Sequence, residues 1–187
     1  MKRLVRLQYN SPTVLTFALL SLGALILGVV TKGATTLRFF SVYRSPLSDL
    51  LTYPRFFFHV LGHESYAHYI GNMMMILVVG PPLEEKYGSR SLLWAILLTA
   101  LVSGMVHWLF FPGTALLGAS GIVFMMIVMS SLSGMKDGRI PMTLVLVLVL
   151  YIGREVINGI TISDNVSQLT HIVGGLCGAM LGLSMRR

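Results

Sequence analysis

The chain has 187 residues, of which 55% are hydrophobic and 11% are charged, and its mean hydropathy is +0.78. Soluble domains carry about 25% charged residues, so this composition excludes a soluble protein and predicts an all-α, polytopic membrane protein with one domain over residues 1–187. The net charge of +7 does not indicate a nucleic-acid partner, because the basic residues lie in short loops and at the termini. The single cysteine, Cys177, excludes an intrachain disulfide and is expected to pack as a small residue.

Six apolar segments predict a bundle of six transmembrane helices. A spanning helix needs about 20 apolar residues, or about 17 at the short end. The second segment is expected to begin nearer to Glu64 than its apolar run does, and the fourth segment is short. The predicted spans are residues 12–31, 68–80, 92–110, 119–132, 140–157 and 169–185.

The long loop after the first span combines aromatic and basic residues between positions 37 and 58. This combination favours the headgroup region of a membrane, so the loop is predicted to be an interfacial element on the outer leaflet. An ordinary folded loop with its own aromatic core remains the alternative. The aromatic residues are Phe39, Phe40, Tyr43, Tyr53, Phe56, Phe57 and Phe58.

Lysine and arginine positions predict the orientation of the spans. With six spans, most basic residues lie on one side, so both termini are expected to be cytoplasmic. These residues are Lys2, Arg3, Arg6, Lys86, Arg90, Lys136, Arg139, Arg186 and Arg187, and the exceptions are Arg154 and the first-loop residues Lys32, Arg38, Arg44 and Arg55.

The second span opens with His68 and Asn72, which are four residues apart and therefore share a helix face. Polar side chains within a bilayer are costly and usually functional. Both can donate hydrogen bonds to an oxyanion, which favours charge stabilisation over nucleophilic attack. A structural hydrogen bond between helices is the alternative.

The fourth span opens with Gly118, Ser120 and Gly121. Fourteen helical residues rise only ~21 Å, against a hydrocarbon thickness of ~30 Å, so the loop over residues 111–118 is expected to dip into the protein beside a water-filled pocket. Ser120 at the helix N-terminus would lie where backbone N–H groups favour an anion. The two glycines permit a tight turn, although this motif alone also fits a packing seam.

The sixth span opens with His171, a candidate general base. Gly174, Gly178 and Gly182 recur every four residues below it, and this stripe allows close approach to a neighbouring helix. If that neighbour is the fourth span, the imidazole comes toward Ser120. A packing stripe below a structural histidine is the alternative.

Spans two, four and six all run from outside to inside, so the three polar clusters are expected at one depth near the outer face. No acidic residue is available within a span as a third catalytic member. The imidazole must then be oriented by packing, and Phe124 lies one turn below Ser120 on the same face.

Other chemistries fit the sequence poorly. His63 and His68 are five residues apart and cannot chelate one zinc ion from a regular helix. No pair of carboxylates lies within the spans, and the polar residues are not at mid-depth as in a transporter. His107 is expected to be structural, and no metal or organic cofactor is implied.

Together these motifs resemble those of rhomboid intramembrane serine proteases of the compact six-helix bacterial type, along nearly the whole chain. The motifs are His68-x-x-x-Asn72, Gly118-x-Ser120-Gly121, His171-x-x-Gly174-x-x-x-Gly178 and, after a long first loop and the second span, Glu84-Glu85-Lys86-Tyr87-Gly88.

The resemblance implies that Ser120 is the nucleophile and His171 its base. His68, Asn72 and the Ser120 backbone N–H would form the oxyanion hole. Gly118 would shape the active-site turn, and His63 would brace the first loop. The chain departs from the family pattern at Pro54-Arg55, where Trp-Arg is usual, and at Phe124, where tyrosine usually stacks on the histidine.

The expected function is hydrolysis of peptide bonds in or near transmembrane segments of other membrane proteins. The substrate helix is expected to approach past the fifth span and residues 164–168, and to unwind near an outward-facing active site in a bacterial-type plasma membrane. A non-proteolytic rhomboid-like protein that binds transmembrane helices is the first alternative, and a small transporter is the second. The sequence does not indicate the oligomeric state.

Overall fold

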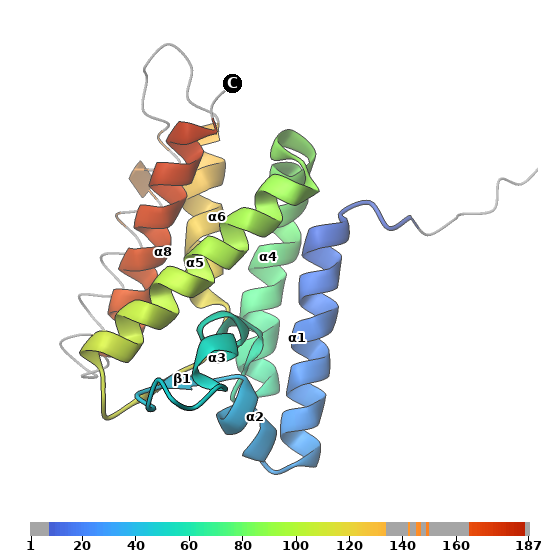
Figure 1. Cartoon of the computed structure of the whole chain (residues 1–187). Coiled ribbons are helices and arrows are strands. Elements are labelled where there is room, and N and C mark those ends of the chain that lie inside the picture. The colour runs from blue at the N-terminus through green and yellow to red at the C-terminus, as the bar shows by residue number, and fades with distance from the viewer. Residues whose placement is uncertain (1–7, 134–141, 143–144, 147–148, 150–164, 186–187) are drawn as a thin grey trace, which may run out of the picture.

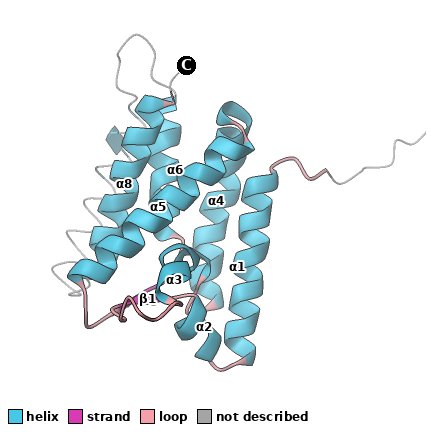
Figure 2. Ribbon diagram, viewed as in Figure 1, coloured by secondary structure: helices cyan, strands magenta, loops and turns pink. Residues whose placement is uncertain are grey.

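The computed structural model describes residues 8–133, Met142, Val145, Leu146, Val149 and residues 165–185, with side chains from Leu169 onward in the last segment. Helices dominate the described chain (Figure 2). The helices are α1 (Pro12–Val30), α2 (Ala34–Phe39), α3 (Thr52–Phe58), the 3-10 helix η1 (His59–Leu61), α4 (Tyr66–Tyr87), α5 (Ser89–Phe110), α6 (Ser120–Ser133) and α8 (Asn165–Ser184), and the strands are β1 (Val42–Tyr43) and β2 (Ala115–Leu116).

Five predicted spans correspond to α1, α4, α5, α6 and α8, which pack as a bundle with α2, α3 and β1 near one end (Figure 1). Among the described residues, α1 and α5 are long and apolar enough to cross a membrane, and α6 and α8 are shorter apolar helices. The predicted fifth span, residues 140–157, lies outside the described residues except at four isolated positions. The count of six spans therefore stays a prediction.

The second span differs most from its predicted bounds. Helix α4 begins at Tyr66, where the Ser65 hydroxyl accepts a hydrogen bond from the His68 amide at 3.1 Å. It continues past Gly80 through Pro81 and Pro82 to Tyr87. Prolines usually end a helix, but here tertiary contacts stabilise the helical turn after them. The Glu84 carboxylate accepts hydrogen bonds from the first amides of α1 at 2.8 and 3.0 Å.

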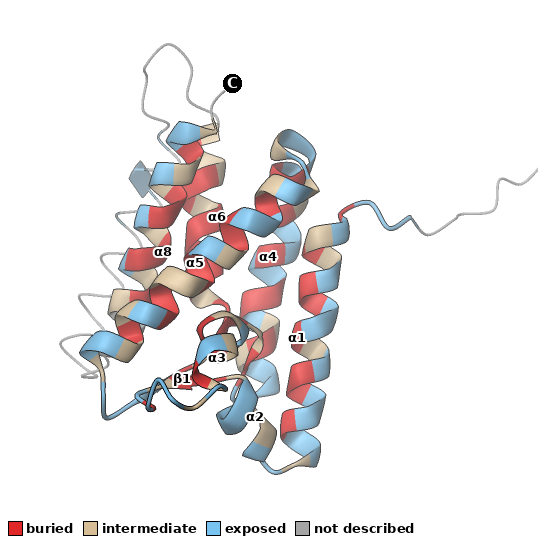
Figure 3. Ribbon diagram, viewed as in Figure 1, coloured by how far each residue is buried: buried red, intermediate tan, exposed pale blue. Residues whose placement is uncertain are grey.

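Helix α6 occupies the centre of the bundle. Its side chains at Ile122, Met125, Met126 and Met129 are fully buried, and the buried faces of the surrounding helices turn toward it (Figure 3). Large apolar side chains on α1, α4, α5 and α8 instead remain exposed, as a surface in contact with lipid requires. This central position holds the start of α6, and therefore Ser120, inside the protein.

The first loop folds onto the end of the bundle. Strand β1 pairs with β2 in antiparallel register, with Val42 opposite Leu116, and these two residues form a small core with Phe56. The expected alternative of a loop core therefore holds in part. Tyr53 and Phe58 remain about half exposed, and the placement of the loop at the membrane interface stays a prediction.

Two arginines fasten this loop. Arg44 donates to the carbonyl oxygens of Trp108 and Leu109 at the end of α5, and its guanidinium lies 4.5 Å from the Trp108 ring. Arg55 is buried and donates to the Arg38 carbonyl and to Asp49. The loop thus keeps an anchored arginine beside Pro54, and Trp108 supplies an aromatic side chain from α5.

Candidate active site

The turn before α6 is the structural centre of the candidate site. Gly118 has a φ of +121°, which side-chain-bearing residues rarely adopt, and Ser120 begins the helix immediately afterward. The Gly118 amide donates to the carbonyl oxygen of His59 at 2.9 Å. The first loop therefore holds the backbone two residues before the serine.

His68 lies directly against this turn. A Cβ added to Gly118 would come within 2.9 Å of the His68 Nε2 atom and 4.0 Å of the Asn72 Nδ2 atom. Only glycine allows the imidazole to approach the backbone this closely. The fold thus brings the turn at Gly118, next to Ser120, together with His68 and Asn72, which lie more than 40 residues earlier in the sequence.

A chain of hydrogen bonds orients Asn72. The Leu61 carbonyl can only accept, so the His63 Nδ1 atom donates to it at 3.1 Å, and the Nε2 atom accepts from the Asn72 amide at 3.1 Å. Burial lowers the pKa of His63 to about 4, and the nearby His68 adds to this shift. His63 is therefore neutral at physiological pH, and Asn72 keeps a second N–H for another acceptor.

Helices α6 and α8 make contact through backbone atoms. A Cβ added to Gly174 would lie 2.2 Å from the Gly121 carbonyl oxygen, and one added to Gly178 would lie 2.4 Å from the Met125 carbonyl oxygen. The glycine stripe of the sixth predicted span thus faces the fourth, which was the condition for bringing His171 toward Ser120. The first turn of α6 therefore lies beside the part of α8 between Thr170 and Gly174, which includes His171.

The His171 imidazole packs on Phe124, with ring centroids 5.1 Å apart and planes inclined by 37°. Phe124 lies one turn after Ser120 on α6, so the aromatic contact holds the imidazole near the start of that helix. Phenylalanine supplies the ring at this position without a hydroxyl group. A Cβ added to Gly121 would lie 3.1 Å from the Thr170 Cγ2 atom, which places the start of α6 beside the residue that precedes His171.

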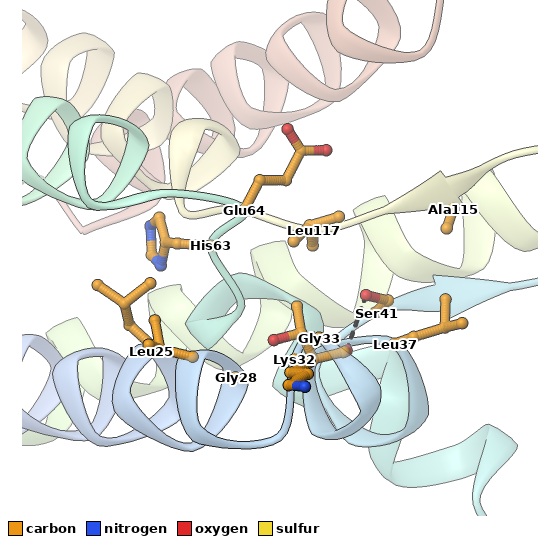
Figure 4. A pocket seen from close by; sticks show the side chains of 12 residues that line it. Leu25, Gly28, Lys32, Gly33, Leu37, Ser41, His63, Glu64, Ala115 and Leu117 are labelled. Carbon is orange, nitrogen blue, oxygen red and sulfur yellow. Dashed lines mark hydrogen bonds between the residues drawn. The ribbon is translucent and has the colours of Figure 1, made fainter.

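A pocket of about 550 Å³ opens beside the turn. Its walls come from the end of α1, from α2, and from His63, Glu64 and Leu117, the last of which precedes Gly118 (Figure 4). Lys32 and Glu64 lie on opposite sides of it (Figure 4). Among the described residues, no group of three or more His, Cys, Asp or Glu side chains could hold a metal ion.

His59 and His107 are buried outside the proposed catalytic set. His59 Nε2 donates to the Ala100 carbonyl at 3.1 Å, and His107 Nε2 donates to the Thr114 carbonyl at 3.2 Å. The structural role expected for His107 agrees with this contact. The link from His59 to Gly118 was not foreseen, because it uses a backbone carbonyl that every residue possesses.

A family model described as the rhomboid domain matches residues 51–187 of this chain. The chain belongs to the rhomboid family. Similar proteins include rhomboid protease GlpG of Pectobacterium atrosepticum, which is 31% identical over 134 residues, covering 68% of this chain and 46% of the relative. As a rhomboid, the protein is a helical integral membrane protein from a family that contains proteases.

Two eukaryotic rhomboids are similarly related. Rhomboid-like protein 15 of Arabidopsis thaliana is 30% identical over 145 residues, covering 70% of this chain and 35% of the relative. Rhomboid-related protein 2 of Mus musculus is 27% identical over 143 residues, covering 70% of this chain and 47% of the relative. The chain therefore spans less than half the length of these curated relatives.

Proposed function

We propose that this rhomboid is an intramembrane serine endopeptidase in which Ser120 is the nucleophile and His171 the general base. The backbone contact between α6 and α8 carries the proposal, because it sets the first turn of α6 beside the turn of α8 that contains His171. The packing of His171 on Phe124 supports it further, since the imidazole needs an orienting partner. The protease named among its relatives supports the same reaction class.

In the first step, the Ser120 Oγ atom attacks the scissile carbonyl carbon while His171 takes the hydroxyl proton. The oxygen that becomes negative would accept hydrogen bonds from His68, from the second Asn72 N–H and from the Ser120 amide. His171 then returns the proton to the leaving amine, so the peptide bond breaks and an acyl-enzyme forms. Water hydrolyses this ester with His171 as base, which restores both residues.

The proposed substrates are membrane proteins whose transmembrane helix unwinds near the outer face. Cleavage would occur beside a small side chain. The proposed approach past the fifth span and residues 164–168 involves parts of the chain outside those whose side chains are described. Cytoplasmic termini and an outward-facing site are parts of the same proposal.

Cleavage of a single-span model substrate in liposomes tests this function. The comparison is between the wild type, Ser120→Ala and His171→Ala, with Ser130→Ala as a control serine on the same helix. The proposal expects cleavage by the wild type and Ser130→Ala only. Equal cleavage by all four proteins would contradict it and point to a different active site or a contaminant.

A further inference from the structure

A second hollow lies between α1, α5 and the first loop, and shares no lining residue with the pocket beside Leu117. It is a groove of about 370 Å³. One end lies where the Thr13 hydroxyl donates to the Ser89 carbonyl at 3.0 Å, and the other where His59 donates to the Ala100 carbonyl. The groove therefore runs along α1 and the first half of α5 toward η1.

The walls of the groove offer nothing to a polar ligand. Thr13 and Thr16 are the two polar side chains among the described lining residues. The Thr13 hydroxyl already bonds to Ser89, and the Thr16 hydroxyl lies 2.9 Å from the Tyr9 hydroxyl. The rest of the lining is apolar, with Leu20, Leu97 and Phe58 as examples. Its occupant must be hydrocarbon.

The dimensions favour a single chain over a helix. The α1 part of the lining runs from Pro12 to Leu20, which corresponds to a rise of about 12 Å. A helix of that length and about 10 Å in diameter occupies roughly 900 Å³, more than twice the volume of the groove. The length also approaches half of the ~30 Å hydrocarbon thickness, which is the depth of one leaflet.

The cationic side chain of Arg90 lies near the end of the groove that is farther from the first loop. Arg90 is exposed, and it precedes the lining residues Leu93 and Leu97 on α5 by three and seven positions. This spacing places all three on one stripe of the helix. A ligand whose tail lies against the leucines would therefore hold its head near the guanidinium, which binds phosphate well.

We propose that this groove binds one acyl chain of an anionic phospholipid, with the lipid phosphate at Arg90 and the tail ending against Phe57 and Leu61. The tail would support η1, whose His59 carbonyl holds the Gly118 amide at 2.9 Å. Occupancy would thereby stabilise the turn before Ser120. This last consequence rests on the proposed protease function, whereas lipid binding does not.

Native mass spectrometry of the delipidated protein, titrated with phosphatidylglycerol, tests the site. Leu97→Trp fills the groove, and Leu98→Trp is its control because that side chain is 42% exposed and lies outside the lining. The wild type and Leu98→Trp are expected to retain one tightly bound lipid that Leu97→Trp loses. Equal retention by the two tryptophan variants would overturn the proposal.

Arg90→Gln provides a second test that leaves the buried packing untouched. It is expected to weaken phosphatidylglycerol binding several-fold and phosphatidylcholine binding less, because the choline ammonium group of phosphatidylcholine offsets the phosphate charge that attracts the guanidinium. An unchanged preference for phosphatidylglycerol would overturn the headgroup assignment. A variant that loses the lipid but cleaves substrate at the wild-type rate would overturn the coupling to the turn before Ser120 and leave the binding site intact.

Discussion

At the scale of single residues, the turn before Ser120 is restricted in both conformation and space. Gly118 combines a φ of +121° with the close approach of His68, whereas Gly113 in the same loop has open space around it. A methyl group at position 118 would displace either the His68 imidazole or the backbone that leads to Ser120. Both changes would disturb the proposed oxyanion site.

Gly118→Ala is therefore expected to reduce kcat for substrate cleavage by about a hundredfold, which is the usual effect of losing an oxyanion donor. Gly113→Ala is expected to retain activity and serves as the matched control. Liposome cleavage rates of the two variants give the comparison. Similar rates for both would contradict the proposed role of this turn.

His63 makes stability depend on pH. Its pKa in the folded protein, about 4, is below the usual 6.5, so the folded state binds fewer protons than the unfolded state between these values. The stabilisation is fully present above about pH 6.5 and is lost as the pH falls toward 4. The melting temperature of His63→Gln should therefore fall less than that of the wild type over this range, and parallel decreases would contradict the assignment.

At the scale of helices, the close contact between α6 and α8 is possible because glycines of α8 have no side chain at the interface. Gly178 faces the Met125 carbonyl, whereas the nearest atom to a Cβ at Gly175 is 4.0 Å away. The glycine spacing predicted such a seam, and the 14-residue length of α6 agrees with the short fourth span. The residue pattern could not identify which helix packs on the stripe, because every neighbouring helix would use the same small residues.

Gly178→Ala is expected to destabilise the protein by about 1–3 kcal/mol, because overpacking must separate two backbones. It should also slow cleavage by moving His171 away from Ser120. Gly175→Ala is expected to do neither. Unfolding in mixed detergent micelles measures the change in stability. An equal loss of stability in both variants would contradict the proposed close packing of α6 and α8 at Gly178.

At the scale of the whole molecule, long-range hydrogen bonds join the outer elements to the bundle. Glu84 binds the first amides of α1, Arg44 binds the end of α5, and His59 binds the turn at Gly118. The sequence predicted neither the Arg44 contact nor the His59 contact, since both acceptors are backbone carbonyls. The sequence also predicted that the second span ends at Gly80, before the two prolines. The hydrogen bonds from α1 to Glu84, which stabilise the helix beyond them, could not be predicted from the sequence.

Glu84→Gln is expected to lower the free energy of unfolding by about 1.5–3 kcal/mol, which is typical of hydrogen bonds to a charged group. Glu85→Gln is the control, since that side chain is exposed. Detergent unfolding curves of both variants measure the difference. Equal stability of the two variants would show that Glu84 does not hold α1 in place.

The most direct measurement of the central proposal is the position at which a fluorophosphonate reacts. The protein and its His171→Ala variant are incubated with the probe in detergent, and the labelled peptide is identified by mass spectrometry. The Ser–His mechanism predicts modification of Ser120 in the wild type and little in His171→Ala. Labelling of another serine would contradict it, and an unlabelled Ser120 would favour a rhomboid that binds transmembrane helices without cleaving them.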